Sequence, residues 1–135
     1  MSGSGFSLWV WVALGSAAGG VARFAVARLW PWMPGAWPVA TMVVNVVGSF
    51  LIGLLSVILT SRAAHPASVE AARVFWMTGV LGGFTTYSAF ALETVALGSE
   101  GEWSRAVLYV MITVVVCLFA AVAGRALGVA VLSEV

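Results

Sequence analysis

Residues 82–90 read GGFTTYSAF and lie in the middle of an apolar segment that is long enough to cross a membrane. Adjacent glycines weaken a helix, and the hydroxyl groups of Thr85, Thr86 and Ser88 can bond backbone groups that a break would free. Irregular backbone at membrane depth persists only where it is buried in protein or lines a wet cavity. The stretch predicts a span broken at its centre. A packing kink explains the glycines alone, whereas the hydroxyls favour an ion or water path.

The composition is that of an integral membrane protein. Of the 135 residues, 62% are hydrophobic and only 8% are charged, and the mean hydropathy is +1.09. This is too little charge to cover the surface of a soluble domain. The formal net charge of +1 provides no basic patch for nucleic acid. We therefore expect a multi-pass protein of the inner or plasma membrane, in contact with lipid.

Four apolar segments have the length of membrane-crossing helices, which is about 20 residues. They predict an all-α membrane protein with a single domain over residues 1–135, whose third helix carries the break. The predicted spans cover residues 6–29, 39–60, 72–97 and 105–132.

The arginines give no preferred orientation in the membrane. Four spans place both termini and the second loop on one side, and three arginines lie toward each side. The first group is Arg62, Arg73 and Arg125, and the second is Arg23, Arg28 and Arg105. Under the positive-inside rule, a chain that inserts both ways would look like this. Short arginine-poor proteins often have small biases, so charge alone leaves dual insertion open.

Small residues recur four positions apart, which lets helix backbones approach closely. Because four spans enclose little interior, these faces also favour a homo-oligomer. The pairs are Gly15 with Gly19, Ser49 with Gly53, Gly79 with Gly83, and Gly124 with Gly128.

Polar side chains occur in the second and fourth spans as well. The amide of Asn45 must face protein or water, because an unpartnered amide in hydrocarbon is costly. A bond between helices and the lining of a pathway explain it equally well. Tyr109, Thr113 and Cys117 follow the i, i+4, i+8 spacing of one helix stripe, which favours a polar track.

Aromatic and charged residues complete the set of candidates. Tyr87 and Phe90 share a helix face, and although such rings usually pack, their positive edges can contact an anion. Arg23 either snorkels to the interface or holds anions in a vestibule. Glu93 pairs with an arginine or faces a water-filled mouth. The chain has one His, no Asp and a single cysteine, Cys117, so we expect neither an enzyme nor a cysteine metal site.

Taken together, these segments resemble the small dual-topology fluoride channels of the Fluc, or CrcB, family. GGFTTYSAF and the following ALET at residues 91–94 are similar to the third-span signature. TMVVNVVGSFLIG at residues 41–53 resembles the second span, and GGVARF at residues 19–24 resembles the first. Length, span count and glycine pattern match over essentially the whole chain.

The resemblance implies an antiparallel homodimer with two fluoride pores and a structural sodium ion at the dimer centre. The sodium would bind the backbone carbonyls of Gly82 and Thr85 from both copies, and oxygen ligands suit such a hard cation. The vestibule arginine of the family corresponds to Arg23. The fluoride pathway would comprise Asn45, Thr86, Tyr87, Ser88, Phe90, Tyr109, Thr113 and Cys117.

Three positions depart from the family pattern. Tyr87 stands where Phe is usual, Ala89 where Thr is common, and Cys117 where a hydroxyl is commoner. A thiol is a weaker hydrogen-bond donor than a hydroxyl. We expect these changes to alter anion coordination and to leave the fold unchanged.

The implied activity is passive, fluoride-selective export that lowers cytoplasmic fluoride. The alternative is a small multidrug-type proton-coupled transporter, which also has four spans and dual topology. That mechanism needs a membrane-embedded acid, usually in the first span, where this chain has Arg23 and no acid; Glu93 lies in the third span. A non-transporting membrane subunit would explain the glycines but not the hydroxyls.

Overall fold

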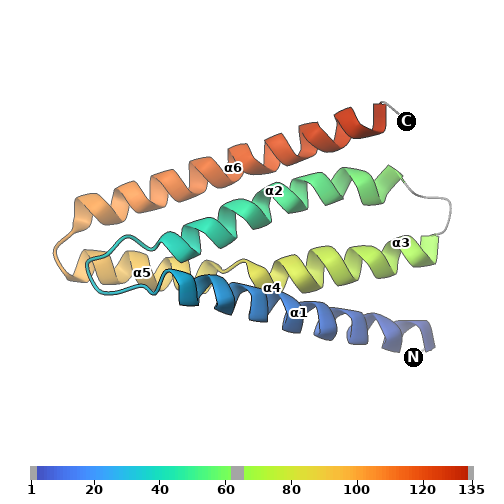
Figure 1. Ribbon diagram of the computed structural model, residues 1–135, viewed down its shortest axis with the longest axis horizontal. Coiled ribbons are helices and arrows are strands. Elements are labelled where there is room, and N and C mark those ends of the chain that lie inside the picture. Colours follow the sequence, from blue (N-terminus) through green and yellow to red (C-terminus); the bar gives the residue numbers. More distant parts are fainter. Residues whose placement is uncertain (1–2, 62–65, 134–135) are drawn as a thin grey trace.

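The computed structural model describes residues 3–61 and 66–133, so Arg62 of the charge count lies outside the described residues. Four helical rods lie side by side (Figure 1), and each is long and apolar enough to cross a membrane. The predicted all-α architecture is therefore confirmed. The elements are α1 (Gly3–Leu29), α2 (Val39–Ser61), α3 (Pro66–Arg73), the π-helix η1 (Val74–Leu81), α4 (Gly82–Phe84), α5 (Tyr87–Ser99) and α6 (Trp103–Ser133).

The helix ends differ most from expectation in the third span. The apolar pattern predicts residues 72–97, whereas the helical rod runs from α3 to the end of α5 at Ser99. The sequence of α3, PASVEAAR, is polar. A hydropathy pattern detects only the part of a helix that fits the hydrocarbon, so it cannot see a polar helical extension beyond it.

The connections lie as four spans require. The N-terminal ends of α1 and α3 and the C-terminal ends of α2 and α6 lie at one end of the bundle, and the α1–α2 and α5–α6 loops lie at the opposite end (Figure 1). The α5–α6 turn depends on Gly101, whose φ of +82° favours glycine. Around it, the N–H of Glu102 donates to the carbonyl of Leu97 at 3.0 Å, which terminates α5.

Glycines bring the rods into backbone contact in two pairs, α2 with α6 and α1 with η1 and α4. A Cβ added at Gly53 would overlap the carbonyl oxygen of Ala121, and one at Gly124 would overlap that of Phe50. A Cβ at Gly15 would lie 2.5 Å from the carbonyl oxygen of Phe75. The small residues therefore pack helices, as predicted. They do so within one chain, so they give no support to an oligomer.

The third span is broken where the opening stretch predicts. Thr85 (φ −79°, ψ 159°) and Thr86 (φ −150°, ψ 114°) are extended between α4 and α5. The Thr86 hydroxyl accepts a 3.2 Å bond from the N–H of Ala89 and so caps α5. Beyond the break, Phe90 and Leu97 of α5 pack against Ala106 and Tyr109 of α6 in the buried core cluster. This packing fixes the direction of α5.

We predict opposite effects for two adjacent glycines of α1. A Cβ at Gly19 would overlap the carbonyl oxygen of Val80 and lie 2.8 Å from the backbone nitrogen of Phe84, whereas one at Gly20 meets nothing within 4 Å. Gly19→Ala should destabilise the bundle by about 2 kcal/mol through overpacking. Gly20→Ala should be neutral or slightly stabilising, because alanine favours helix. Size-exclusion profiles after heating in detergent would measure both, and equal losses would contradict the packing.

Candidate functional site

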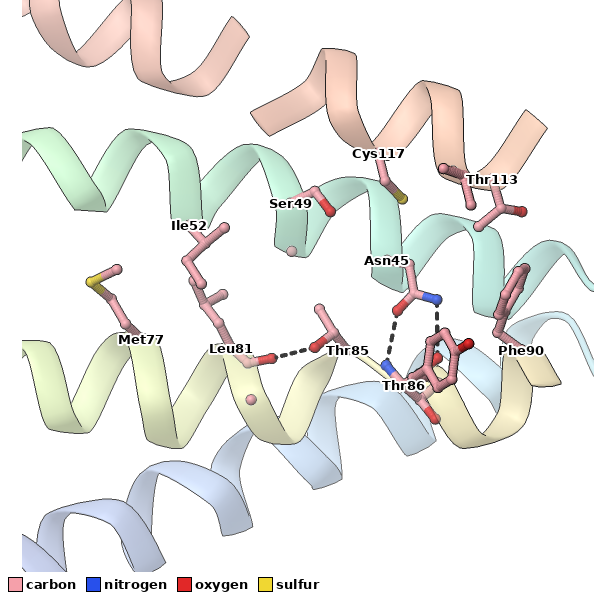
Figure 2. Close-up of a pocket in the computed structure, with 14 residues that line it drawn as sticks. Asn45, Ser49, Ile52, Met77, Leu81, Thr85, Thr86, Phe90, Thr113 and Cys117 are labelled. Carbon is pink, nitrogen blue, oxygen red and sulfur yellow. Dashed lines mark hydrogen bonds between the residues drawn. The ribbon is translucent and has the colours of Figure 1, made fainter. Parts of the chain in front are cut away.

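A cavity of about 370 Å³ opens at the break, between α2, the third span and α6 (Figure 2). We call it the break cavity. Its apolar end is formed by Ile52, Met77 and Leu81, which lie beyond Thr85 in the close-up. Besides Gly48, Gly82 and Val114, the rest of its lining is polar or aromatic, and it contains no carboxylate. These residues are Asn45, Ser49, Thr85, Thr86, Tyr87, Phe90, Thr113 and Cys117.

Asn45 bonds both backbone polar groups of Thr86, which belong to the peptide units on either side of that residue. Its Oδ1 accepts a 2.8 Å bond from the Thr86 N–H, and its Nδ2 donates a 3.1 Å bond to the Thr86 carbonyl. Figure 2 shows the amide of α2 directed at the extended segment. Of the two roles left open for Asn45, the bond between helices is therefore present. One amide N–H remains for the cavity that Asn45 lines.

The fourth-span stripe faces the interior, but its three members have different surroundings. Tyr109 is fully buried, and its hydroxyl donates to Oε2 of Glu93 at 2.8 Å. Thr113 is 4% exposed and lines the break cavity. In the described part of the chain, its hydroxyl has no hydrogen-bond partner. Cys117 is half-buried and also lines the cavity.

Three aromatic rings form a row beside the break. The ring centroids of Tyr87 and Phe90 are 5.7 Å apart, and those of Phe90 and Tyr109 are 5.2 Å apart. Phe90 is 8% exposed, whereas Tyr87 is 80% exposed. Ser88 is also exposed, and its hydroxyl lies 3.4 Å from the Thr86 hydroxyl. The outer part of the row is thus uncovered in a single chain.

A second cavity of about 320 Å³ lies between α1, α2 and α5, and Arg23 lines it together with Glu93. We call it the Arg23 cavity. Glu93 is buried, and Thr41 donates to its Oε1 at 2.7 Å while Tyr109 donates to its Oε2. Arg23 and the Glu93 carboxylate thus line the same cavity, and the hydroxyl groups of Thr41 and Tyr109 hold the carboxylate in place. Thr86 lines both cavities, so it forms part of the wall between them.

The sequence analysis missed a polar stripe on α2. Thr41 and Ser49 lie four residues on either side of Asn45, which is the spacing that identified the stripe on α6. Thr41 bonds Glu93, and Ser49 lines the break cavity. The four-residue spacing could have predicted this stripe. However, a single hydroxyl group in an apolar helix usually bonds its own backbone, so it is a weak indication of a functional site.

The break diverts the amide donors that would otherwise occupy two carbonyls. In a continuous helix the N–H of Thr86 would bond the carbonyl of Gly82, and that of Ala89 would bond the carbonyl of Thr85. Here the Thr86 N–H donates to Asn45 and the Ala89 N–H to the Thr86 hydroxyl. The N–H of Thr85 donates to Leu81, four residues back. The carbonyl oxygens of Gly82 and Thr85 therefore lack the amide donors that a continuous helix would give them, and carbonyl oxygens suit a hard cation.

Comparison with known proteins places these features in a family. Residues 10–125 match the family described as CrcB-like protein, Camphor Resistance (CrcB). The proteins named Fluoride-specific ion channel FluC of Magnetococcus marinus and Deinococcus radiodurans are 42% and 46% identical over 119 and 125 residues. The first alignment covers 87% of this chain and 94% of the relative, and the second covers 91% and 96%.

A further relative is longer than this chain. The protein of Methylococcus capsulatus with the same name is 45% identical over 118 residues. That alignment covers 87% of this chain and 50% of the relative, so the chain spans half of its length. The matched residues include the second and third spans, most of the first and fourth, and all the residues that line the two cavities. The chain therefore belongs to the family of CrcB-like proteins.

Proposed function

We propose that this protein is a passive, fluoride-selective channel of the cell membrane that lets fluoride leave the cytoplasm. The relatives that share its length and spans are named fluoride-specific ion channels. The break cavity lies at membrane depth, and hydroxyl, amide and aromatic groups line it. An anion in such a place needs hydrogen-bond donors in exchange for its water, and no carboxylate there repels it.

The observation that carries this proposal is the buried hydroxyl of Thr113. It lines the break cavity and has no partner in the described part of the chain. A buried hydrogen-bond donor that has no acceptor costs about 1–3 kcal/mol of stability. Natural proteins therefore rarely keep such a group unless a ligand or a water accepts from it. A hydroxyl donates readily to a small anion, and its bond to a charged acceptor is stronger than one to a neutral acceptor.

The other donors surround the same space. Asn45, with its spare amide N–H, and Cys117, with its thiol, line it together with Thr113, and the rings of Phe90 and Tyr87 also line it. Small, fixed donors favour fluoride because they replace its water step by step at short distance. Arg23 lines the neighbouring cavity with Glu93, and its positive charge, offset in part by that carboxylate, would attract anions toward the Thr86 wall.

The membrane potential drives export without a coupled reaction. Weak-acid HF enters an acidified cell, ionises and leaves as the anion through the channel. An interior-negative potential contributes about 2.3 kcal/mol per 100 mV for each charge moved. The competing proton-coupled transporter would need an acid that is free to exchange protons in the first span. α1 contains none, and both oxygens of Glu93 accept bonds from hydroxyls.

The working unit of this proposal is an antiparallel dimer of two copies. Gly82, Tyr87 and Ser88 are exposed at the centre of the third span. The backbone groups freed by a break, and the hydroxyl groups of a serine and a tyrosine, do not face lipid at this depth. Hydrocarbon offers them no hydrogen-bond partners. A second copy of this chain supplies the cover, and the even distribution of arginines permits it to be inverted.

A sodium ion at the dimer centre completes the assembly. The carbonyls of Gly82 and Thr85 would hold it, because their helical amide donors are diverted to other acceptors. Bound there, sodium would neutralise the negative ends of the α4 dipoles and join the two copies. Four carbonyls, two from each copy, would give the oxygen-rich shell that a hard cation requires.

Fluoride flux from liposomes containing only this protein tests the activity. We expect fluoride to leave rapidly when a potassium ionophore clamps the potential, and chloride to be retained. Ion-selective electrodes would record both anions from the same vesicles. Chloride efflux as fast as fluoride efflux would refute selectivity, and a flux that depends on a proton gradient would favour the transporter.

A second prediction concerns the orphan hydroxyl. Thr113→Val keeps the side-chain shape and removes the donor, so fluoride flux should fall about tenfold or more, as expected for losing a bond to a charged group. Thermal stability should be unchanged or slightly higher, since an unsatisfied group is removed. Thr94→Val is the matched control, because that hydroxyl bonds the carbonyl of Phe90 in its own helix. Equal flux in both variants would remove Thr113 from the pathway.

A third prediction concerns sodium. Replacing sodium by N-methylglucamine at constant ionic strength should increase the monomer fraction in detergent, because a ligand that binds only the dimer stabilises it by mass action. Without sodium, the dimer would lose about 2.7 kcal/mol of stabilisation if the ion is normally present at 100 times its dissociation constant. Light scattering on a size-exclusion column would measure the masses. An unchanged dimer in both salts would exclude the ion as a structural component.

A further inference from the structure

One side chain outside the third span controls which carbonyls the break releases. The Thr86 N–H is the helical donor of the Gly82 carbonyl, and Oδ1 of Asn45 takes it at 2.8 Å. The N–H of Thr85, the other donor near that carbonyl, is bonded to Leu81 at 3.0 Å. Asn45 is therefore the competitor that keeps the Gly82 oxygen out of the helical ladder.

We infer that Asn45 is a positioning residue for the cation site, which creates the Gly82 ligand by withdrawing the Thr86 N–H from it. The inference deepens the proposed function and rests on the sodium site proposed there. Asn45 lies on α2 and contacts the site only through Thr86, so it is not itself a ligand. Its amide Nδ2 also donates to the Thr86 carbonyl at 3.1 Å, which fixes the orientation of the peptide unit between Thr86 and Tyr87.

Asn45 both accepts and donates at this position, and the Gly82 ligand depends on the accepting oxygen. Asparagine offers one acceptor oxygen and an amide donor, and each meets one polar group of Thr86. Aspartate has the same shape and retains the acceptor, but it cannot donate to the carbonyl. Leucine has the same branching, with two methyl groups in place of the amide, and offers neither. The three residues therefore separate the accepting function from the donating one.

The same arrangement couples the cation to the anion pathway. Thr86 lies between Asn45 and the first residues of α5, and its hydroxyl caps that helix through the N–H of Ala89. If the Thr86 N–H returned to Gly82, the extended segment would close into helix and Tyr87 and Phe90 would turn away from their present direction. Asn45 thus sets the metal ligand and the aromatic row by one pair of bonds.

A sodium titration of dimer stability in detergent tests the inference. Wild type, Asn45→Leu, Asn45→Asp and Thr113→Val would be heated over a series of sodium concentrations at constant ionic strength. We expect the half-maximal sodium concentration to rise about tenfold or more in Asn45→Leu. This is the change that corresponds to the free energy of the one hydrogen bond that the Asn45 oxygen accepts. It should remain near the wild-type value or fall in Asn45→Asp, and remain unchanged in Thr113→Val, because the Thr113 hydroxyl makes no hydrogen bond to Thr86.

Several results would overturn the inference. A wild-type sodium response in Asn45→Leu would do so, and so would an equal loss in Asn45→Asp and Asn45→Leu. If Asn45→Leu does not fold, hydrogen exchange of the wild-type protein decides: the Thr86 amide should be protected, and rapid exchange would contradict its bond to Asn45. Fluoride selectivity is read separately in liposomes, so a non-selective protein with the expected sodium series would refute the channel and retain the positioning role.

Discussion

A peptide group in the middle of a bilayer must find a hydrogen-bond partner within the protein, because hydrocarbon offers none. The third span meets this condition in an unusual way at Thr86, where the side chain of Asn45 replaces the missing helical partners. The break is thereby stable, and the carbonyls that lose their amide donors become available for another use. The rest of the account depends on this exchange.

The exchange connects features that are separate in the sequence. It holds α5 at a fixed angle behind the break, where Phe90 packs between Tyr87 and Tyr109. The break cavity lies beside Thr86, and its wall contains the hydroxyl of Thr113, which has no partner among the described residues. Glycine contacts between α2 and α6, and between α1 and the third span, supply a rigid frame, since they bring helix backbones together with little room for adjustment.

Much of this fold follows from the sequence, because hydropathy and span length are strong signals and GGFTTYSAF breaks the third helix on local grounds. The partner of Asn45 could not be predicted, since the bond joins residues 41 positions apart and depends on how two helices pack. The same holds for Glu93, which bonds Thr41 and Tyr109. The glycine pairs were placed correctly in helix packing, but spacing alone cannot distinguish contacts within a chain from contacts between chains.

The account predicts how the exposed side of the break is covered, and a density map of the protein in a lipid nanodisc with sodium and fluoride would show it directly. We predict two inverted copies that meet at Gly82, Tyr87 and Ser88, with an extended segment at Thr85 and Thr86 and a spherical density between the carbonyls. An unbroken third helix, or acyl chains lying against these residues, would contradict the account.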